Sequence, residues 1–285
     1  MEACEVIRLF VNKAVVSAEP KRRGNPGFGR LKALRVLVYS RLKGLENDTR
    51  IVEHLKKHTW VARTLGLRSV PDRTTVGRWW RRYLNLLEEV FRKIVGMLEQ
   101  ITPTTHLIAD STPLEDLYDL EAEWGYTSEG WFRGFKLHSV VNQLGLPMNA
   151  VVTPGNRYDS PILPSLIEDL EAEYVLADAG YDSESNIKAV KAIGAIPVIA
   201  VNPRNGRRRR LSRAEAELLR AKRYLVEQFN GLVKNQVLKQ CWTRPKGITK
   251  KASMTMAGLI GIDANAVRAL IQDETSLKTV SKYWT

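Results

Sequence analysis

TyrValLeuAlaAspAlaGlyTyrAsp, residues 174–182, is the stretch that decides the fold. A run of strand-forming residues stops at Asp178, and Gly180 then supplies a turn. HisLeuIleAlaAsp (106–110) repeats this pattern and stops at Asp110. Both carboxylates are therefore expected at the carboxyl ends of strands, the edge where sites gather in open α/β sheets.

Strands and helices are expected to alternate around these two segments. Thr112–Glu115 matches a capping box with proline at the first helical position, which predicts a short helix there. The predicted order is β-β-β-α-β-α-β-α, an α/β fold with parallel crossovers and helices on the sheet faces. The remaining strands are expected at 135–142, 148–153 and 196–201, and helices near 162–171 and 184–193 and in one long helix that contains Glu227.

The third organising stretch is ArgTyrLeuValGluGlnPheAsnGlyLeuValLys (223–234), which reads as an amphipathic helix. Arg223, Glu227, Asn230 and Lys234 fall within an arc of roughly 100°, away from the apolar stripe. Three carboxylates, Asp110, Asp178 and Glu227, with basic neighbours suit a site for a hard cation and a phosphate. Simpler interpretations are strand-end or turn roles for the two aspartates and a surface ion pair for Glu227.

Residues 1–100 are expected to be all-helical, with residues 101–285 forming a second domain that ends in a buried closing helix, 254–271. A long helix from about Arg73 to Glu99 carries Arg78, Arg81 and Arg82 beside Trp79 and Trp80. A short helix, a glycine turn and a helix with a basic beginning resemble a helix-turn-helix DNA-binding unit. A helical packing domain with arginines facing water is the alternative.

The net charge of +13 is unevenly distributed. Residues 1–100 hold 21 Lys/Arg against 10 Asp/Glu, residues 101–200 hold 5 against 15, and residues 201–285 hold 18 against 6. Basic segments of this strength, including Arg207–Arg210 and 242–251, commonly follow a phosphate backbone. A solvated basic surface is the alternative.

Membrane insertion and secretion are not expected, because no uncharged apolar run reaches the length of a span and no signal peptide is recognised. Cys4 and Cys241 have no zinc-ligand spacing. We therefore expect reduced thiols and a cytoplasmic location. Trp124, Tyr126, Trp131 and Phe132 are interpreted as a small satellite core, with stacking on an unpaired base as the alternative.

Several motifs, in order over about residues 50–270, resemble insertion-sequence transposases of the DDE kind, in the insertion sequence 4/5 group without a large insertion. AspSerThr (110–112) is similar to the first-Asp motif and AlaAspAlaGlyTyrAsp (177–182) to the second. GlyPheLysLeuHis (134–138) and AsnArgTyrAspSer (156–160) are similar to the landmarks between them. Arg223, Glu227 and Lys234 keep the spacing of the Tyr-Arg-Glu-Lys signature, but the tyrosine position is Arg220, and Tyr224 follows Arg223.

This resemblance implies an RNase H-like catalytic core that binds two Mg²⁺ ions, or Mn²⁺ as a substitute, through Asp110, Asp178 and Glu227. The implied activity is cleavage at the ends of a mobile element, followed by attack of the freed 3′-hydroxyl on target DNA. Arg223 and Lys234 would contact phosphates, and Lys136 and His138, on one strand face, are further candidates for DNA contact. The implied partners are double-stranded terminal repeats and target DNA, with a homodimer on DNA and a nucleoid-associated location. A nuclease or resolvase of the same fold and a non-catalytic DNA-binding protein are the rival interpretations.

Overall fold

The computed structural model describes residues 3–14, 27–127, 130–205, 210–238, 243, 245–278 and 283. Most of the Arg207–Arg210 run, and Trp242 and Arg244 of the basic segment near the C-terminus, lie outside these residues. The chain divides into two compact units, Met1–Ile101 with Val233–Thr285, and Thr102–Leu232. The C-terminal segment, which we expected to belong with the sheet, groups with the N-terminal helices.

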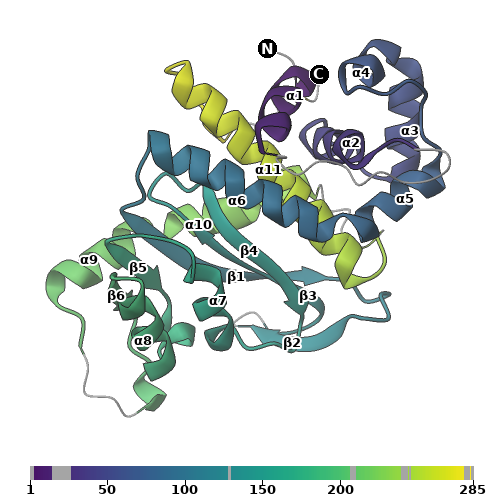
Figure 1. Ribbon diagram of the computed structural model, residues 1–285. Helices are drawn as coiled ribbons and strands as arrows, with labels where there is room; N and C mark the ends of the chain where they lie inside the picture. The colour runs from purple at the N-terminus through teal and green to yellow at the C-terminus, as the bar shows by residue number, and fades with distance from the viewer. Residues whose placement is uncertain are drawn as a thin grey trace. The chain divides into compact units, whose positions relative to one another are not determined.

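The first unit is helical (Figure 1). Its long C-terminal helix, α11, packs against α2, α5 and α6, which explains why the closing helix belongs to this unit. The long helix expected over 73–99 is instead two helices that break at Tyr83. The helices are α1 (Ala3–Ala14), α2 (Arg30–Leu42), α3 (Asp48–Lys57), α4 (Thr59–Thr64), α5 (Arg73–Arg82), α6 (Leu84–Ile101), a π-helix (Val233–Val237) and α11 (Ile248–Ile271).

By length and composition alone, α11 is apolar enough to cross a membrane, yet 89% of its most apolar window is buried within the structure. Helices at the centre of a folded core have the same composition. The burial of α11 therefore accounts for its apolar sequence.

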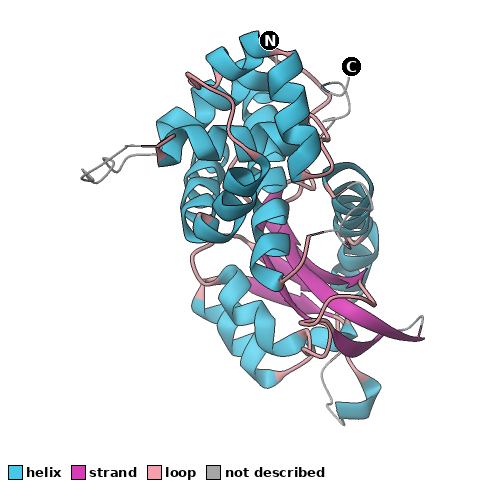
Figure 2. Cartoon of the chain, turned by 90° about the vertical axis from the view of Figure 1, so that its right-hand side faces the viewer, coloured by secondary structure: helices cyan, strands magenta, loops and turns pink. Residues whose placement is uncertain are grey.

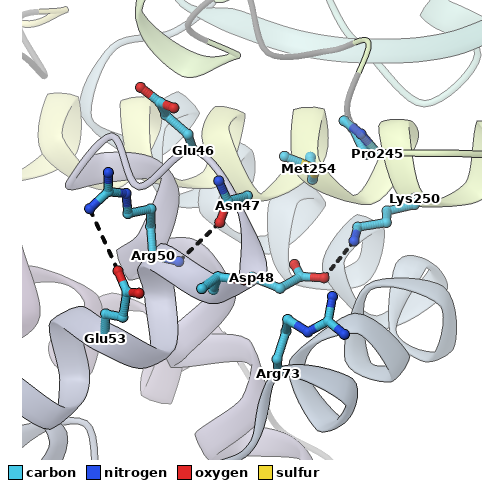
Figure 3. A pocket seen from close by; sticks show the side chains of 10 residues that line it. Glu46, Asn47, Asp48, Arg50, Glu53, Arg73, Pro245, Lys250 and Met254 are labelled. Atoms are coloured by element: carbon cyan, nitrogen blue, oxygen red, sulfur yellow. Dashed lines mark hydrogen bonds and ion pairs between the residues drawn. The ribbon is translucent and has the colours of Figure 1, made fainter.

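Asp48 joins three helices of the helical unit. One carboxylate oxygen accepts a hydrogen bond from the Trp80 indole at 3.0 Å, and the other lies 2.6 Å from the ammonium of Lys250 on α11 (Figure 3). A cleft of about 600 Å³ opens beside this group, and its other polar walls include Arg50, Glu53 and Arg73. Acidic and basic side chains alternate around it, so the cleft does not favour one sign of charge.

The second unit contains a six-stranded mixed sheet (Figure 2). β3 pairs antiparallel with β1 along one edge, and with β4 and β2 along the other. β1, β5 and β6 are parallel. The strands are β1 (His106–Glu115), β2 (Glu123–Thr127), β3 (Gly130–Val141), β4 (Pro147–Pro154), β5 (Tyr174–Ala177) and β6 (Ile196–Ile199).

Two expectations about this sheet are wrong. β1 does not end at Asp110, and no helix starts at Thr112, because β1 stays paired with β3 as far as Glu115. β5 pairs with β1 only up to Ala109, so the later residues of β1 have an open edge among the described strands. Pro113 is tolerated there, because a missing N–H on an unpaired edge costs no sheet hydrogen bond. β2 was not expected at all.

The helices of this unit follow the expected order, with one break. A 3-10 turn (Ser160–Ile162) and α7 (Leu163–Ile167) precede β5, and α8 (Glu184–Ala192) precedes β6. The single long helix expected to contain Glu227 is instead α9 (Arg213–Lys222) and α10 (Tyr224–Leu232), which meet at Arg223. α10 packs on β1 and β3.

Candidate active site

Asp110 and Asp178 lie side by side on neighbouring parallel strands. Ala109 of β1 is paired with Ala177 of β5, so Asp110 and Asp178, the residues that follow them, lie level with each other just beyond this pairing. Adjacent strands are about 4.8 Å apart. The Asp178 side chain also accepts a hydrogen bond from the Gly180 N–H at 2.9 Å, so this residue stabilises its turn as well. The two carboxylates are therefore close neighbours in the sheet unit.

α10 brings Glu227 to the same face of the sheet. Asn230 donates a hydrogen bond from Nδ2 to Oδ2 of Asp110 at 3.0 Å, and its Oδ1 accepts one from the Ser139 hydroxyl at 3.1 Å. Asp110 and Ser139 are cross-strand partners, which share a sheet face. Glu227 precedes Asn230 by one turn and so lies on the same side of α10.

Arg223 connects the second and third carboxylates. Its Nη2 lies 3.9 Å from Oδ2 of Asp178, and its Nε lies 3.2 Å from Oε1 of Glu227. Both carboxylates therefore reach one cationic group. The expected surface pair between Arg223 and Glu227 exists, but it also includes Asp178.

The donor chemistry of this group fits a divalent cation, because carboxylate oxygens are the ligands that Mg²⁺ prefers. As placed, no three His, Cys, Asp or Glu side chains in the described part of the chain are close enough to enclose an ion. Arg223 holds the position between Asp178 and Glu227. Its side chain is exposed, so it has room to turn aside when a cation enters.

The pKa of Asp110 reflects the charges around it. Burial, and then the nearby charges of Asp178 and Glu227, raise the pKa of Asp110 to about 6, although the Ser111 N–H and Arg223 act in the opposite direction. A carboxyl whose ionised form is disfavoured by its neighbours gains most from a cation placed among them. Positive charge placed beside Asp110 would therefore favour its ionised form.

Lys136 and His138 do not belong to this site. Ser139 of β3 is the cross-strand partner of Asp110 and shares its face of the sheet. Side chains alternate between the two faces along a strand, so Lys136 and His138 lie on the opposite face. Lys136 is 6% exposed and donates to Asp159 at 3.1 Å, and His138 is fully buried with its Nε2 2.9 Å from the Thr153 hydroxyl. Burial lowers the pKa of His138 to about 4. The expectation that both contact DNA is wrong, because neither reaches the surface.

The other basic candidates belong to the helical unit. Arg78, Arg81 and Arg82 are exposed on α5, and Lys234 is half-buried on the π-helix that follows α10. In the sheet unit, Arg220 and Tyr224 line one cleft of about 390 Å³ together with Arg223 and Glu227. Tyr224 thus lines the same cleft as Arg220, the residue at the tyrosine position of the signature.

Two residues at the site were not assigned roles from the sequence. Asn230 was on the predicted polar arc of its helix, and its position one turn after Glu227 was the available signal. Tyr181 lies within the AspAlaGlyTyrAsp stretch and is 1% exposed. Burial, and then the charges of Asp159, Asp110 and Asp178, raise its pKa well above the ordinary value.

Comparison with known protein families identifies the class of protein to which the chain belongs. Residues 101–259 match the family of the transposase DDE domain, and residues 4–82 match a second model, transposase domain (DUF772). The chain belongs to the transposase DDE domain family.

A Brucella ovis protein assigned as the transposase of insertion sequence element IS6501 is 40% identical over 70 residues, 22% of this chain and 54% of that protein. The match thus spans about half the length of the relative. The piggyBac transposase in a synaptic complex with hairpin DNA is 11% identical, with a TM-score of 0.48 over 99% of this chain and 75% of that one. This second likeness is too weak to bear on function.

Proposed function

We propose that this protein is the transposase of an insertion sequence, and that it catalyses metal-dependent DNA cleavage and strand transfer. The observation that supports the proposal is the placement of Asp110 and Asp178 level with each other after paired residues of two parallel strands, with Arg223, where α9 and α10 meet, between Asp178 and Glu227. Membership of the DDE family supports the same activity, and it implies a requirement for divalent metal in general.

Asp110, Asp178 and Glu227 would hold Mg²⁺, with Mn²⁺ as a substitute and two ions in the complete site. When bound, a pair of such ions provides an activated oxygen nucleophile and relieves charge on the scissile phosphate and the leaving oxygen. The mixed sheet with Asp110 and Asp178 on adjacent strands supports an RNase H-like core, and the helical unit supports a separate DNA-binding region.

Other residues of the chain position the DNA and the carboxylates. Asn230 fixes α10 against β1 through its bond to Asp110. Arg223 becomes a forked phosphate donor once its two carboxylate partners are engaged elsewhere, and Lys234 adds a compact positive charge. The exposed arginines of α5, Arg78, Arg81 and Arg82, would contact the backbone of the element's ends.

The proposed partners are the terminal repeats and the target, both double-stranded DNA. Cutting two ends of one element within one complex requires at least a dimer. A protein that cuts and joins chromosomal DNA would be associated with the nucleoid.

The test uses DNA that carries the sequences flanking the gene, supplied either intact or with preprocessed 3′-hydroxyl ends. With Mg²⁺ the protein should nick intact ends and join the preprocessed ends to a second duplex. Asp178→Asn should abolish both products, whereas Asp169→Asn, at an exposed carboxylate on the surface of the same unit, should change neither. Cleavage without joining would indicate a nuclease or resolvase, and binding without either product would indicate a non-catalytic DNA-binding protein.

A further inference from the structure

The sheet unit exposes a cluster of large apolar side chains that the candidate active site does not use. Its members come from the loop after β1 and from the β2–β3 hairpin, and each is between 56% and 96% exposed. Several large exposed apolar side chains on neighbouring segments commonly mark a contact site. We call this set the hairpin patch: Leu117, Tyr118, Leu120, Trp124, Tyr126 and Trp131.

The aromatic part of the hairpin patch lies on one face of two paired strands. Tyr126 is the cross-strand partner of Trp131, and Trp124 is the partner of Arg133. The Tyr126 and Trp131 rings meet edge to face, with centroids 5.4 Å apart. The opposite face is buried through Phe132 and Gly125. The expected satellite core is therefore wrong for three of the four aromatics, since only Phe132 is inside.

Hydrogen bonds fix the backbone of the loop that carries Leu117, Tyr118 and Leu120. Arg133 donates to the carbonyls of Leu117 and Asp119, and its own carbonyl accepts from the Asp116 N–H at 2.9 Å. Asp116 and Asp119 are buried, and each accepts a bond from the backbone N–H two residues later. Because the loop is fixed in this way, docking on the patch costs little ordering entropy.

The charge around the hairpin patch indicates which kind of partner it can bind. Residues 115–126 contain five acidic residues and no lysine or arginine, and Glu115, Glu121 and Glu123 are exposed. A DNA backbone would be repelled by this rim. A basic protein surface would be attracted, and the flanking segments of this chain carry a surplus of 21 − 10 = 11 positive charges over residues 1–100 and 18 − 6 = 12 over residues 201–285.

We propose that the hairpin patch docks on the basic surface of a second copy of this chain and is the contact that forms the dimer. Two hairpin patches facing each other would place like charges together, so each patch meets the basic surface of the other copy. Such a reciprocal contact occurs twice in a twofold dimer and closes the assembly. The inference names the surface of the dimer proposed above, but it does not depend on catalysis.

The first experiment measures self-association of the full chain, free of metal and nucleic acid, by sedimentation velocity over a concentration series. Trp131→Ala should raise the dimer dissociation constant at least tenfold, as is typical for truncation of a central interface tryptophan. Ile196→Ala removes a 47% exposed apolar side chain from β6, at the other end of the sheet from the hairpin patch and outside both basic segments, and should leave the constant unchanged. Raised salt should weaken the dimer. A chain that is monomeric throughout, or a dimer indifferent to Trp131→Ala, would overturn the proposal.

The second experiment identifies what lies against the hairpin patch. A photoreactive phenylalanine analogue replaces Trp131, and light and heavy isotope-labelled copies are mixed before irradiation. Crosslinks between light and heavy copies, mapped to residues 1–101 or 210–285, support the proposal. Crosslinks confined to single chains would instead indicate that a chain's own basic surface covers the patch. A tenfold loss of affinity for DNA with unpaired ends in Trp131→Ala, with dimerisation unchanged, would assign the patch to DNA bases. Neither experiment measures DNA cleavage, so a negative result in either would overturn the proposed dimer contact without bearing on the proposed catalytic activity.

Discussion

Asn230 donates a hydrogen bond to Asp110 at 3.0 Å, although the two residues are 120 positions apart in the chain. The same side chain accepts from the Ser139 hydroxyl at 3.1 Å. One amide thus fixes α10 to both β1 and β3. The position of Glu227, one turn earlier on α10, depends on this attachment.

Asn230→Ala should weaken metal binding and cleavage by about 10–100-fold, because residues that orient ligands have effects of this size. The loss should appear as a higher Mg²⁺ concentration at half-maximal cleavage, measured on a DNA end in a metal titration. Asn85→Ala, at an exposed helical position, is the control and should behave as the wild type. Unaltered metal dependence in Asn230→Ala would show that α10 is positioned by other contacts.

Asp110→Asn should stabilise the fold while abolishing cleavage. The pKa of Asp110 is raised to about 6 from an ordinary value of 3.8, so the folded state holds its proton more tightly than the unfolded state. Wild-type stability from this group is therefore greatest below about pH 4 and is lost as pH rises through about 6. The variant should gain about 1–3 kcal/mol in its free energy of unfolding at pH 8, and no advantage at about pH 3.5.

Metal-free chemical denaturation at the two pH values measures this difference. Asp169→Asn, at an exposed carboxylate, should show no pH-dependent gain. An Asp110→Asn variant that is equally or less stable than the wild type at pH 8 would contradict the electrostatic description of the site.

Arg223→Gln should bind divalent metal more tightly but cleave more slowly. The guanidinium competes with the metal for Asp178 and Glu227, and an exposed ion pair is worth about 0.2–1 kcal/mol, so affinity should rise roughly two- to fivefold. Cleavage should fall because a forked phosphate donor is lost. Arg213→Gln breaks a matching pair, Arg213 to Glu217 at 3.0 Å on α9, and should alter neither quantity. Calorimetric Mn²⁺ titration that shows weaker binding to Arg223→Gln would argue against this competition.

Lys136 and Arg81 should differ in how they affect DNA binding. Arg81→Gln removes an exposed cation, so the slope of log affinity against log salt should become shallower by about one unit. Lys136→Gln should leave that slope unchanged, because Lys136 is buried against Asp159, but should lower stability by about 1–3 kcal/mol through the broken pair. Fluorescence anisotropy in a salt series, with thermal unfolding alongside, distinguishes the two. A shallower slope for Lys136→Gln would restore this residue as a DNA contact.

Local pattern was sufficient to locate the strand segments that precede Asp110 and Asp178, because each is an apolar run that stops at the aspartate, although β1 continues past Asp110. It was insufficient where two local signals competed. Thr112–Glu115 has the residues of a capping box, yet pairing with β3 extends the strand through Pro113. Such pairing between distant segments overrides a local helix signal.

Burial was the second quantity that sequence could not supply. Lys136 and His138 were correctly expected on one face of their strand, but which face is covered depends on Asp159 and β4, which lie elsewhere in the chain. The breaks at Tyr83 and Arg223 carry no glycine or proline, so nothing in the local sequence marked them. The contact of Asn230 with Asp110 could not be predicted, because it depends on how α10 is placed against β1, which only the folded structure provides.

The most direct test of the central claim is a crystal structure of the protein soaked in Mn²⁺, with anomalous density recorded at the manganese edge. We expect density within about 2.2 Å of carboxylate oxygens of Asp110 and Asp178, with Glu227 turned toward it and Arg223 displaced. The same density should be absent from crystals of Asp110→Asn. Manganese bound elsewhere, with these carboxylates still paired to Arg223, would contradict the assignment of this group as the catalytic metal site.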